Sequence, residues 1–241
     1  MPRSLIDLLW RHHPAAPAAG TRGPRARVQT DDVVDAAITL ADADGLPAVT
    51  VRRLAERLGL STMSVYTHVN SRDDLLVLMA DAAHARMTLP SHGRAGWRTR
   101  VRRVADANLA LYDSHPWLVE VTDERVALGP GTIAKYDHEL QAVVPLGLDE
   151  VTTDAALTFV LDFVRASART LYPGTSAAAL GEHWPEWSSR LAAYVGEEFP
   201  IARRVGAAAG EAMGTAYSPS LAWEFGLGRV LDGLAALTEG R

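Results

Sequence analysis

The stretch that decides the fold is TVRRLAERLGLSTMSVYTHV, residues 50–69. Thr50 is a candidate N-cap for one short helix, and Ser61 is a candidate N-cap for a second, even shorter one. Gly59 lies between them, where a tight turn needs a backbone conformation that other residues resist. The spacing predicts two short helices packed across a tight turn, which is the arrangement of a helix-turn-helix.

Six side chains are expected to face outward from the second helix and its end, once the apolar residues of both helices are packed inside. They are Thr62, Met63, Ser64, Tyr66, Thr67 and His68. A short helix with small polar residues near its N-terminus fits a DNA major groove about 12 Å wide and reaches base edges there. Asn70 and Arg72 follow, where backbone amides and a cation would meet phosphate.

The alternative is an ordinary helical hairpin with Tyr66 and His68 as plain surface residues. The exposed Tyr-Thr-His run, the shortness of both helices and the basic segment before them favour binding to double-stranded DNA. The net charge of −5 is unevenly distributed: residues 1–103 hold fifteen arginines and ten acidic residues (+5), whereas residues 104–241 hold nine basic and nineteen acidic residues (−10). This asymmetry indicates that the N-terminal part binds an anion and that the rest of the chain has a different function.

Composition excludes several classes of protein. The chain has 241 residues, 48% hydrophobic and 22% charged, as expected of a globular protein with a small and a larger domain. Because it has no cysteine, disulfides, thiolate metal sites and a cysteine nucleophile are excluded. No apolar run reaches the ~18–20 residues that cross a bilayer, and Leu5–Trp10 lacks the features of a secretory signal. We therefore expect a soluble, cytoplasmic protein with no membrane partner.

The chain is expected to begin with a flexible basic arm over residues 1–29. Residues 11–29 are rich in Pro, Ala, Gly and Arg and show no apolar periodicity. Residues 30–90 would form the helix-turn-helix domain, with Thr30 as its first N-cap and Ser71 as its last.

Residues 91–241 would form a larger helical domain. Apolar periodicity predicts helices at 97–114, 131–144, 149–171, 184–195, 201–213 and 219–238. No alternating strand pattern occurs anywhere in the chain. The predicted fold is therefore all-α, with a three-helix, homeodomain-like helix-turn-helix domain followed by a larger helical ligand-binding and dimerisation domain.

Residues 30–90 resemble the DNA-binding domain of the TetR (tetracycline-repressor) family. The resemblance is carried by Ala36-Ala37, Asp44-Gly45, TVRRLA at 50–55, LGL at 58–60, SVYTHV at 64–69 and SRDDLL at 71–76. It implies that Arg52 approaches a base in the major groove and that Thr62 through Thr67 supply further base and sugar contacts. It also implies that phosphates are held by Tyr66, His68 and Arg72.

Three arginines of the arm, Arg22, Arg25 and Arg27, have two possible roles. They would enter the adjacent minor groove or bind phosphate, if the arm contacts DNA. A solvated tail without contacts is the alternative, and the sequence leaves both open.

The rest of the chain resembles the regulatory domain of the same family, most clearly in SHPWL at 114–118 and AWEFGLGRVLDGLAAL at 222–237. In that subgroup the domain binds an inducer and dimerises. Residues 155–164 are apolar around most of a helix, and glycines in 219–238 would let another helix approach closely. We expect a homodimer on a pseudo-palindromic operator, with core helices of a monomer as the alternative.

A small-molecule effector would bind in this second domain, in a mostly apolar cavity with few polar groups. The candidate wall residues are Trp97, Val104, Asn108, Tyr112, Trp117, Tyr136, Phe159 and Phe163. Asn108 is a polar residue on an apolar helix face, so it needs a partner, either a neighbouring protein group or the effector. Thr88, Val104 and Thr122 stand where tetracycline repressors place drug- or magnesium-binding residues. Binding of a metal–tetracycline chelate is therefore not expected.

No catalytic constellation is evident, and we expect neither an enzyme nor a bound metal or cofactor. Gly-x-Ser-x-Gly, a phosphate-binding glycine loop and His-Glu-x-x-His are absent. His115, His138 and His183 lie on separate elements, and Asp137 and Glu139 would lie on a solvated face. The sequence predicts a DNA-binding transcriptional regulator, a repressor released by its effector. A protein-interaction module and a cofactor-dependent helical enzyme are the rival hypotheses.

Overall fold

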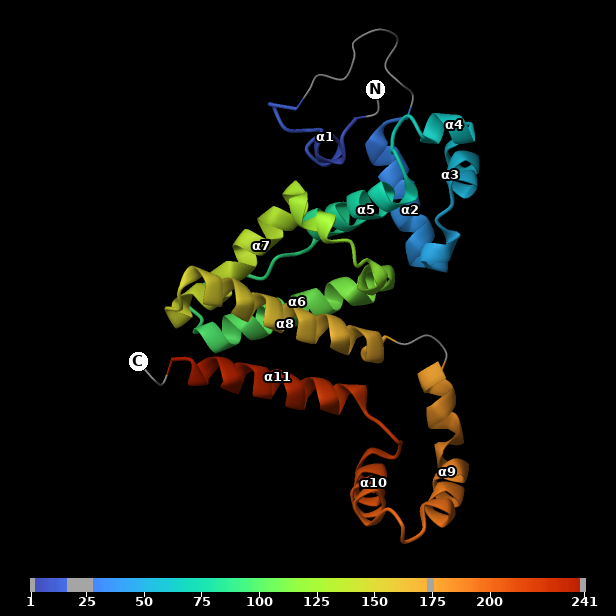
Figure 1. Ribbon diagram of the computed structural model, residues 1–241, viewed down its shortest axis with the longest axis vertical. Helices are drawn as coiled ribbons and strands as arrows, with labels where there is room; N and C mark the ends of the chain where they lie inside the picture. Colours follow the sequence, from blue (N-terminus) through green and yellow to red (C-terminus); the bar gives the residue numbers. More distant parts are fainter. Residues whose placement is uncertain (1–2, 17–27, 173–175, 239–241) are drawn as a thin grey trace. The chain divides into compact units, whose positions relative to one another are not determined.

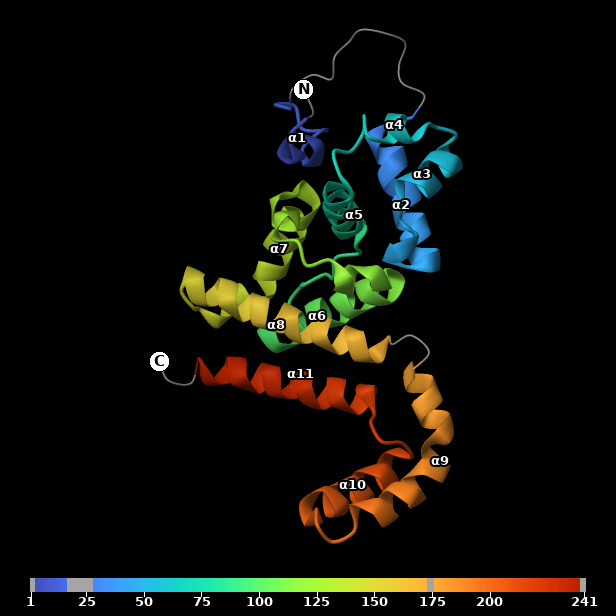
Figure 2. The same cartoon turned by 45° about the vertical axis from the view of Figure 1, so that its right-hand side comes forward.

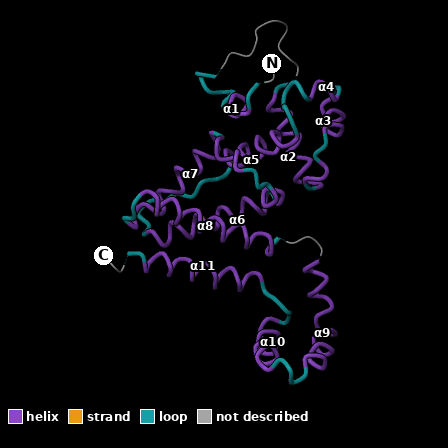
Figure 3. Tube along the Cα trace, in the orientation of Figure 1, coloured by secondary structure: helices purple, strands orange, loops and turns teal. Residues whose placement is uncertain are grey.

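The computed structural model describes residues 3–16, 28–172 and 176–238. Within these ranges the chain forms helices joined by loops and contains no strand (Figure 3). The all-α prediction is confirmed. No helix in the described part has the length and apolar character needed to cross a membrane. The chain divides into two compact units, residues 1–161 and residues 162–240, which we describe separately.

Both units are built from consecutive helices (Figure 1). The first unit contains α1 (Leu5–Leu9), α2 (Thr30–Asp44), α3 (Val51–Leu58), α4 (Thr62–Val65), α5 (Arg72–Arg86), α6 (Trp97–Ser114), α7 (Pro130–Val143) and the first half of α8 (Glu150–Leu171). Short 3-10 helices join them: η1 (Leu46–Ala48), η2 (Pro116–Glu120), η3 (Glu124–Leu128) and η4 (Val144–Leu146). The second unit contains the end of α8, α9 (Ser176–Val195), α10 (Pro200–Met213) and α11 (Pro219–Ala236).

The helices beyond residue 96 lie close to their predicted positions. α6 coincides with the predicted 97–114 helix, and α7, α8, α10 and α11 differ from prediction by one or two residues at their ends. α9 is the exception, because it begins at Ser176 rather than near residue 184. A proline usually lies in the first turn of a helix, but Pro185 lies inside α9, so it is a misleading start signal there.

The core of the first unit joins the helix-turn-helix to the elements that follow it. Leu54 of α3, Val65 of α4 and Leu78 of α5 are buried, and the same apolar cluster includes Trp117 and Leu118 of η2. Burial of such side chains is the main favourable contribution to folding. The helix-turn-helix therefore shares one core with part of the chain that follows it.

The prediction of a flexible arm over residues 1–29 is wrong for its first part. Residues Leu5–Leu9 form the short helix α1 (Figure 2). Ser4 caps it by accepting a hydrogen bond from Asp7 N, and Leu8 and Leu9 are 1% and 2% exposed in the core. Leu5, Leu8 and Leu9 have the i, i+3, i+4 spacing of an amphipathic helix, but five residues are too few for a clear periodic signal.

The N-cap of α2 also differs from prediction. The cap is Gln29, whose backbone N–H donates to Asp32 Oδ2 at 2.6 Å. Thr30 is instead the first helical residue, and it is buried. Its hydroxyl oxygen accepts a hydrogen bond from Arg3, a long-range partner that local sequence does not reveal.

The N-terminus of α7 lies directly against α5. The carboxylate of Asp81 accepts hydrogen bonds from the backbone N–H of Thr132, at 2.7 Å, and from its hydroxyl, at 3.1 Å. Two glycines make room for this contact, because a Cβ on Gly129 would lie 2.1 Å from Asp81 Oδ1 and a Cβ on Gly131 would lie 2.4 Å from the Asp81 carbonyl oxygen. We call Asp81, Gly129, Gly131 and Thr132 the α5–α7 joint.

Gly131→Ala should destabilise the protein, because the added methyl group meets backbone and not a flexible side chain. The expected loss in the free energy of unfolding is about 1–3 kcal/mol, as for overpacked cores. Urea denaturation monitored by circular dichroism measures it. Gly206→Ala is the matched control, since a Cβ there meets no atom within 4 Å. Equal stability of Gly131→Ala and wild type would contradict the proposed close contact.

Candidate nucleic-acid interface and effector site

The helix-turn-helix is held by three local caps. The Thr50 hydroxyl oxygen accepts from Arg53 N, Gly59 ends α3 in the left-handed region at φ 64°, and the Ser61 hydroxyl oxygen accepts from Ser64 N. α4 ends at Val65, and the chain continues as a turn in which His68 N donates to the carbonyl of Val65 at 3.0 Å. We call residues 62–68 the reading turn, because only its first part is α-helical.

The reading turn presents the predicted side chains on one face. Met63 and Tyr66 are 73% and 49% exposed, so the reading turn offers one apolar and one aromatic side chain to a partner. Thr62 and Thr67 are exposed as well, while Ser64 and His68 are half-buried. Local hydrogen bonds order this surface: the Ser64 and Ser61 hydroxyls lie 2.8 Å apart, and the Thr67 hydroxyl donates to the Ser64 carbonyl. The site therefore combines an ordered backbone with solvent-facing donors, acceptors and an aromatic ring.

Arg52 lies on the exposed side of α3. Its Nε donates to Glu56 Oε1 at 2.9 Å, and the arginine and glutamate side chains are 84% and 62% exposed. An exposed pair one helical turn apart contributes little to stability. Arg52 can therefore leave Glu56 for a base at little cost to the fold.

Asn70 and Arg72 are both engaged within the protein. The Asn70 amide donates to the backbone carbonyl of Arg3 and to Asp74 Oδ2, both at 2.9 Å. The Arg72 guanidinium donates to the carbonyls of Leu46, at 3.0 Å, and Val49, at 3.4 Å. Arg72 thus ties α5 to the loop between α2 and α3, a supporting role that the sequence did not reveal.

His68 is expected to be uncharged at neutral pH. Burial lowers its pKa below the ordinary value, and the positive charge of Arg3 acts in the same direction, against a smaller opposing effect of Asp32. A neutral imidazole still offers one N–H to a phosphate, without a charge. Arg25 and Arg27, the predicted arm contacts, lie outside the described residues.

Two of the predicted effector residues on α6, Val104 and Asn108, belong to a buried polar cluster. Asn108, 2% exposed, donates to the Val104 carbonyl at 2.9 Å and to Glu139 Oε1 at 2.5 Å. Glu139 is 1% exposed and accepts a hydrogen bond from Lys135 Nζ at 2.7 Å. The expectation that Glu139 lies on a solvated face is wrong, because it forms a buried ion pair with the lysine one turn earlier on α7. Protein groups accept the hydrogen bonds of the Asn108 side-chain nitrogen.

The remaining wall candidates are spread over different surroundings. Trp117 is buried in the helix-turn-helix core, where its Nε1 donates to Asp42 Oδ1 at 2.7 Å. Trp97 and Tyr112 are half-buried, and Phe159 is exposed. The Tyr136 hydroxyl donates to Asp154 at 2.7 Å, and this bond raises the pKa of the tyrosine. In the second unit, Phe163 stacks on Trp223 with ring centroids 5.5 Å apart.

Three cavities among the described residues are lined by none of the predicted wall residues. One of about 220 Å³ lies beside Thr88, Leu111 and His115 in the first unit. A second, of about 410 Å³, lies beside Asp31 and Asp81. The third, of about 570 Å³, lies between α9 and α10 of the second unit, which form a helical hairpin (Figure 2). Among the described residues, no three His, Asp or Glu side chains are placed to hold a metal ion.

Comparisons with known proteins match both the helix-turn-helix part of the chain and the part that follows it. The family "Bacterial regulatory proteins, tetR family" matches residues 33–79, and "Tetracyclin repressor-like, C-terminal domain" matches residues 89–238. The HTH-type transcriptional repressor DrrR1 of Streptomyces coeruleorubidus is 32% identical over 98% of this chain and 86% of its own length. The tetracycline repressor protein class D of Escherichia coli is 34% identical over 83 residues, which cover 33% of this chain and 38% of that protein.

A solved structure extends the likeness to three dimensions. The TetR family protein ActR of Streptomyces coelicolor, in complex with actinorhodin, is 25% identical with a TM-score of 0.72. The match covers 88% of this chain and 99% of that one. Two family matches account for most of the sequence, and a named repressor aligns with nearly all of it. The chain therefore belongs to the tetR family and is a helix-turn-helix transcriptional regulator.

Proposed function

We propose that this protein binds a pseudo-palindromic operator as a homodimer in the cytoplasm, represses transcription there and is released by a small aromatic or apolar effector. The observation that carries the proposal is the reading turn, an ordered and exposed surface that combines small polar side chains with Met63 and Tyr66. The full-length similarity to a repressor supports the direction of regulation. The relatives are named as regulators, and the proposal includes no enzymatic activity.

Dimerisation is supported by apolar side chains left exposed on two helices. On α11, Leu221 and Phe225 are 56% and 72% exposed, and on the first half of α8, Val151 and Phe159 are exposed too. Within the second unit, Gly226 allows α11 to approach Phe163 in the second half of α8. Exposed apolar faces of this kind are typical of protein–protein interfaces. A dimer would present two reading turns to half-sites about one helical repeat of DNA apart.

The effector is proposed to act on the buried cluster of Asn108, Lys135 and Glu139 or on the apolar side chains near it. Similar regulators were solved with small molecules bound, including ActR with actinorhodin. A ligand that rearranged α7 would also disturb the α5–α7 joint, because Thr132 at the start of α7 donates to Asp81 on α5. The effector would thus shift the population of states that bind DNA.

Tyr66→Ala should weaken operator binding with little loss of fold, since the ring is half-exposed and lies at the end of the reading turn. Loss of a hydrogen bond to a charged phosphate should cost about 1.5–3 kcal/mol. Fluorescence anisotropy at fixed salt measures it. Tyr194→Ala, at a 78% exposed tyrosine of the second unit, is the control. If both variants bind the operator as wild type does, the reading turn is not the interface.

Arg52→Ala should relax sequence preference at one base pair by about 1–3 kcal/mol, because an arginine in the major groove pairs with a guanine edge. Binding to a panel of single-base operator variants measures the preference. Arg190→Ala removes a comparable exposed arginine, beside Glu186 in the second unit, and should change nothing. An unaltered base preference in Arg52→Ala would refute the assignment.

Magnesium–tetracycline should not release this protein from its operator, because Thr88, Val104 and Thr122 offer no imidazole or amide to the chelate. Actinorhodin serves as the polycyclic aromatic probe and is expected to release it. A tetracycline repressor on its own operator is the positive control for the chelate. Release by magnesium–tetracycline, read by anisotropy, would show that this effector site is misassigned.

A further inference from the structure

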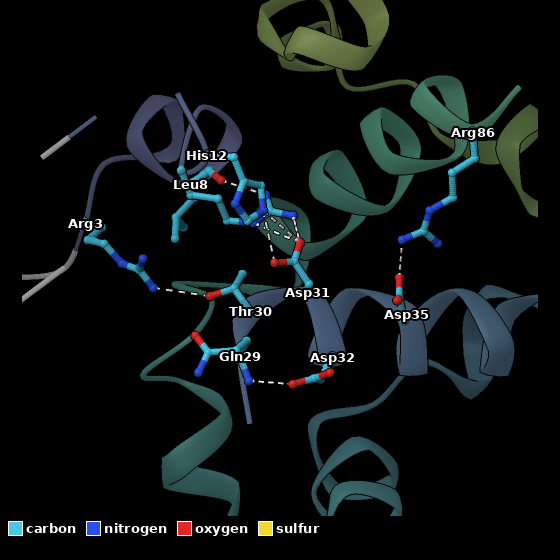
Figure 4. A network of polar contacts seen from close by, with 10 residues as sticks. Arg3, Leu8, His12, Gln29, Thr30, Asp31, Asp32, Asp35 and Arg86 are labelled. Carbon is cyan, nitrogen blue, oxygen red and sulfur yellow. Dashed lines mark hydrogen bonds and ion pairs between the residues drawn. The ribbon is translucent and has the colours of Figure 1, made fainter. Parts of the chain in front are cut away.

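The N-terminal residues 3–12 are firmly attached to the DNA-binding half of the first unit. The Arg11 guanidinium donates to Asp31 Oδ1 at 2.5 Å, and His12 Nε2 lies 3.0 Å from Asp31 Oδ2 (Figure 4). On the other side, Trp10 Nε1 donates to the Leu128 carbonyl at 2.8 Å. Leu8 and Leu9 are buried in the core that holds the reading turn. We call residues 3–12 the N-terminal strap.

The ion pair at Asp31 is present at neutral pH. Burial alone would raise the pKa of Asp31, but hydrogen bonds from Arg11 and His12 outweigh it and hold the pKa below the ordinary value. A carboxylate with a lowered pKa stays charged until the pH falls through that value, so this contribution to stability is lost only in acid. The strap is therefore fixed under the conditions in which DNA is bound.

The strap carries Arg3 to the edge of the reading turn. The Asn70 amide, two residues beyond the reading turn, donates to the Arg3 carbonyl at 2.9 Å. The Arg3 guanidinium donates to the Thr30 hydroxyl at 3.3 Å, at the N-terminus of α2 (Figure 4). Its charge also acts on His68, the last residue of the reading turn. Arg3 thus lies beside Thr30, His68 and Asn70, although it is far from them in sequence.

The charge balance around Arg3 favours an anion. Of the nearby acids, Asp31 is paired with Arg11, Asp74 with Arg125, and Asp32 accepts the Gln29 N–H. Among the residues that the structure describes, no carboxylate lies within ion-pair distance of Arg3, and its side chain is exposed. Arg3 is held in place because its backbone carbonyl accepts from Asn70 and its guanidinium donates to the Thr30 hydroxyl. Its side chain still faces solvent. Placement beside the reading turn matches a DNA phosphate, the anion that lines the major groove.

We propose that Arg3 is an additional contact to the operator backbone, and that the N-terminal strap serves to hold it beside the reading turn. The proposal rests on the reading turn being the DNA interface. A phosphate contact adds affinity that is independent of sequence and sensitive to salt. Arg3 would therefore strengthen binding to operator and to random DNA alike.

The test compares Arg3→Ala with wild type, both carrying any tag at the C-terminus. Anisotropy titrations of operator DNA over a salt series give the slope of log K against log salt. Loss of one phosphate contact should lower the magnitude of that slope by about 0.9 and weaken binding severalfold at low salt, with equal loss on random duplex DNA. Arg3→Lys should restore the slope. Arg94→Ala removes an exposed arginine from the α5–α6 connection and should leave it unchanged.

A second pair of variants tests the role of the strap. Trp10→Phe removes the hydrogen bond to Leu128 and should loosen the strap. Because Arg3 is then less well placed, the slope of log K against log salt should fall in magnitude although Arg3 is still present. Combined with Arg3→Ala, Trp10→Phe should cause no further reduction. Thermal unfolding followed by circular dichroism shows that each variant is folded before its titration is interpreted.

An unchanged slope in folded Arg3→Ala would overturn the proposal if Tyr66→Ala still weakens binding. If neither variant weakens binding, the reading turn itself is wrongly assigned. Additive losses in Arg3→Ala and Trp10→Phe would contradict the claim that the strap acts by placing Arg3.

Discussion

The contact between the Asp81 carboxylate and the first turn of α7 is the interaction on which the first unit depends. α5 belongs to the helix-turn-helix core through Leu75, Leu78 and Met79, and Asp81 on the same helix accepts both hydrogen bonds from Thr132. Burial raises the pKa of Asp81 above its ordinary value, although the hydrogen bonds from Thr132 and the N-terminus of α7 act in the opposite direction. Gly129 and Gly131 are required because any side chain would displace the carboxylate or the α5 backbone. The same helix, α5, thus packs against the helix-turn-helix on one side and bonds to α7 on the other.

Local signals explain why so much of the fold could be predicted. Thr50, Ser61 and Ser71 cap their helices as expected, and Gly59 takes the left-handed conformation that the turn needs. These interactions link residues three apart, so they are visible in the sequence. The exposed residues of the reading turn follow from the same pattern, because its apolar positions are buried in the core.

Long-range partners explain what the sequence could not reveal. The docked strap depends on Arg11 and Asp31, and the role of Arg72 depends on carbonyls more than twenty residues earlier. Glu139 is buried because Asn108 of another helix and Lys135 complete its hydrogen bonds. A buried ion pair is stable only when such partners are in place, and tertiary packing provides them. Residue type alone predicts an aromatic wall, and the structure places these side chains in separate surroundings.

Direct contacts join the reading turn to η3 and, through α5, to α7. The reading turn is fixed by its own caps, by Arg72 on the loop after α2 and by the Asn70–Asp74–Arg125 contacts that reach η3. These contacts are the route by which we propose that a change in η3 or α7 reaches the reading turn, through α5. The N-terminal strap adds a further tie, because it bonds to Asp31 and to Leu128 at the end of η3.

The central claim is that α5 and α7 form one cooperative unit, and native-state hydrogen exchange in increasing urea tests it directly. The account predicts that the amide of Thr132 and the amides of α5 around Asp81 exchange through the same opening, with equal free energies and equal urea dependence. Exchange of Thr132 through a separate opening of lower free energy, while α5 stays protected, would contradict the account.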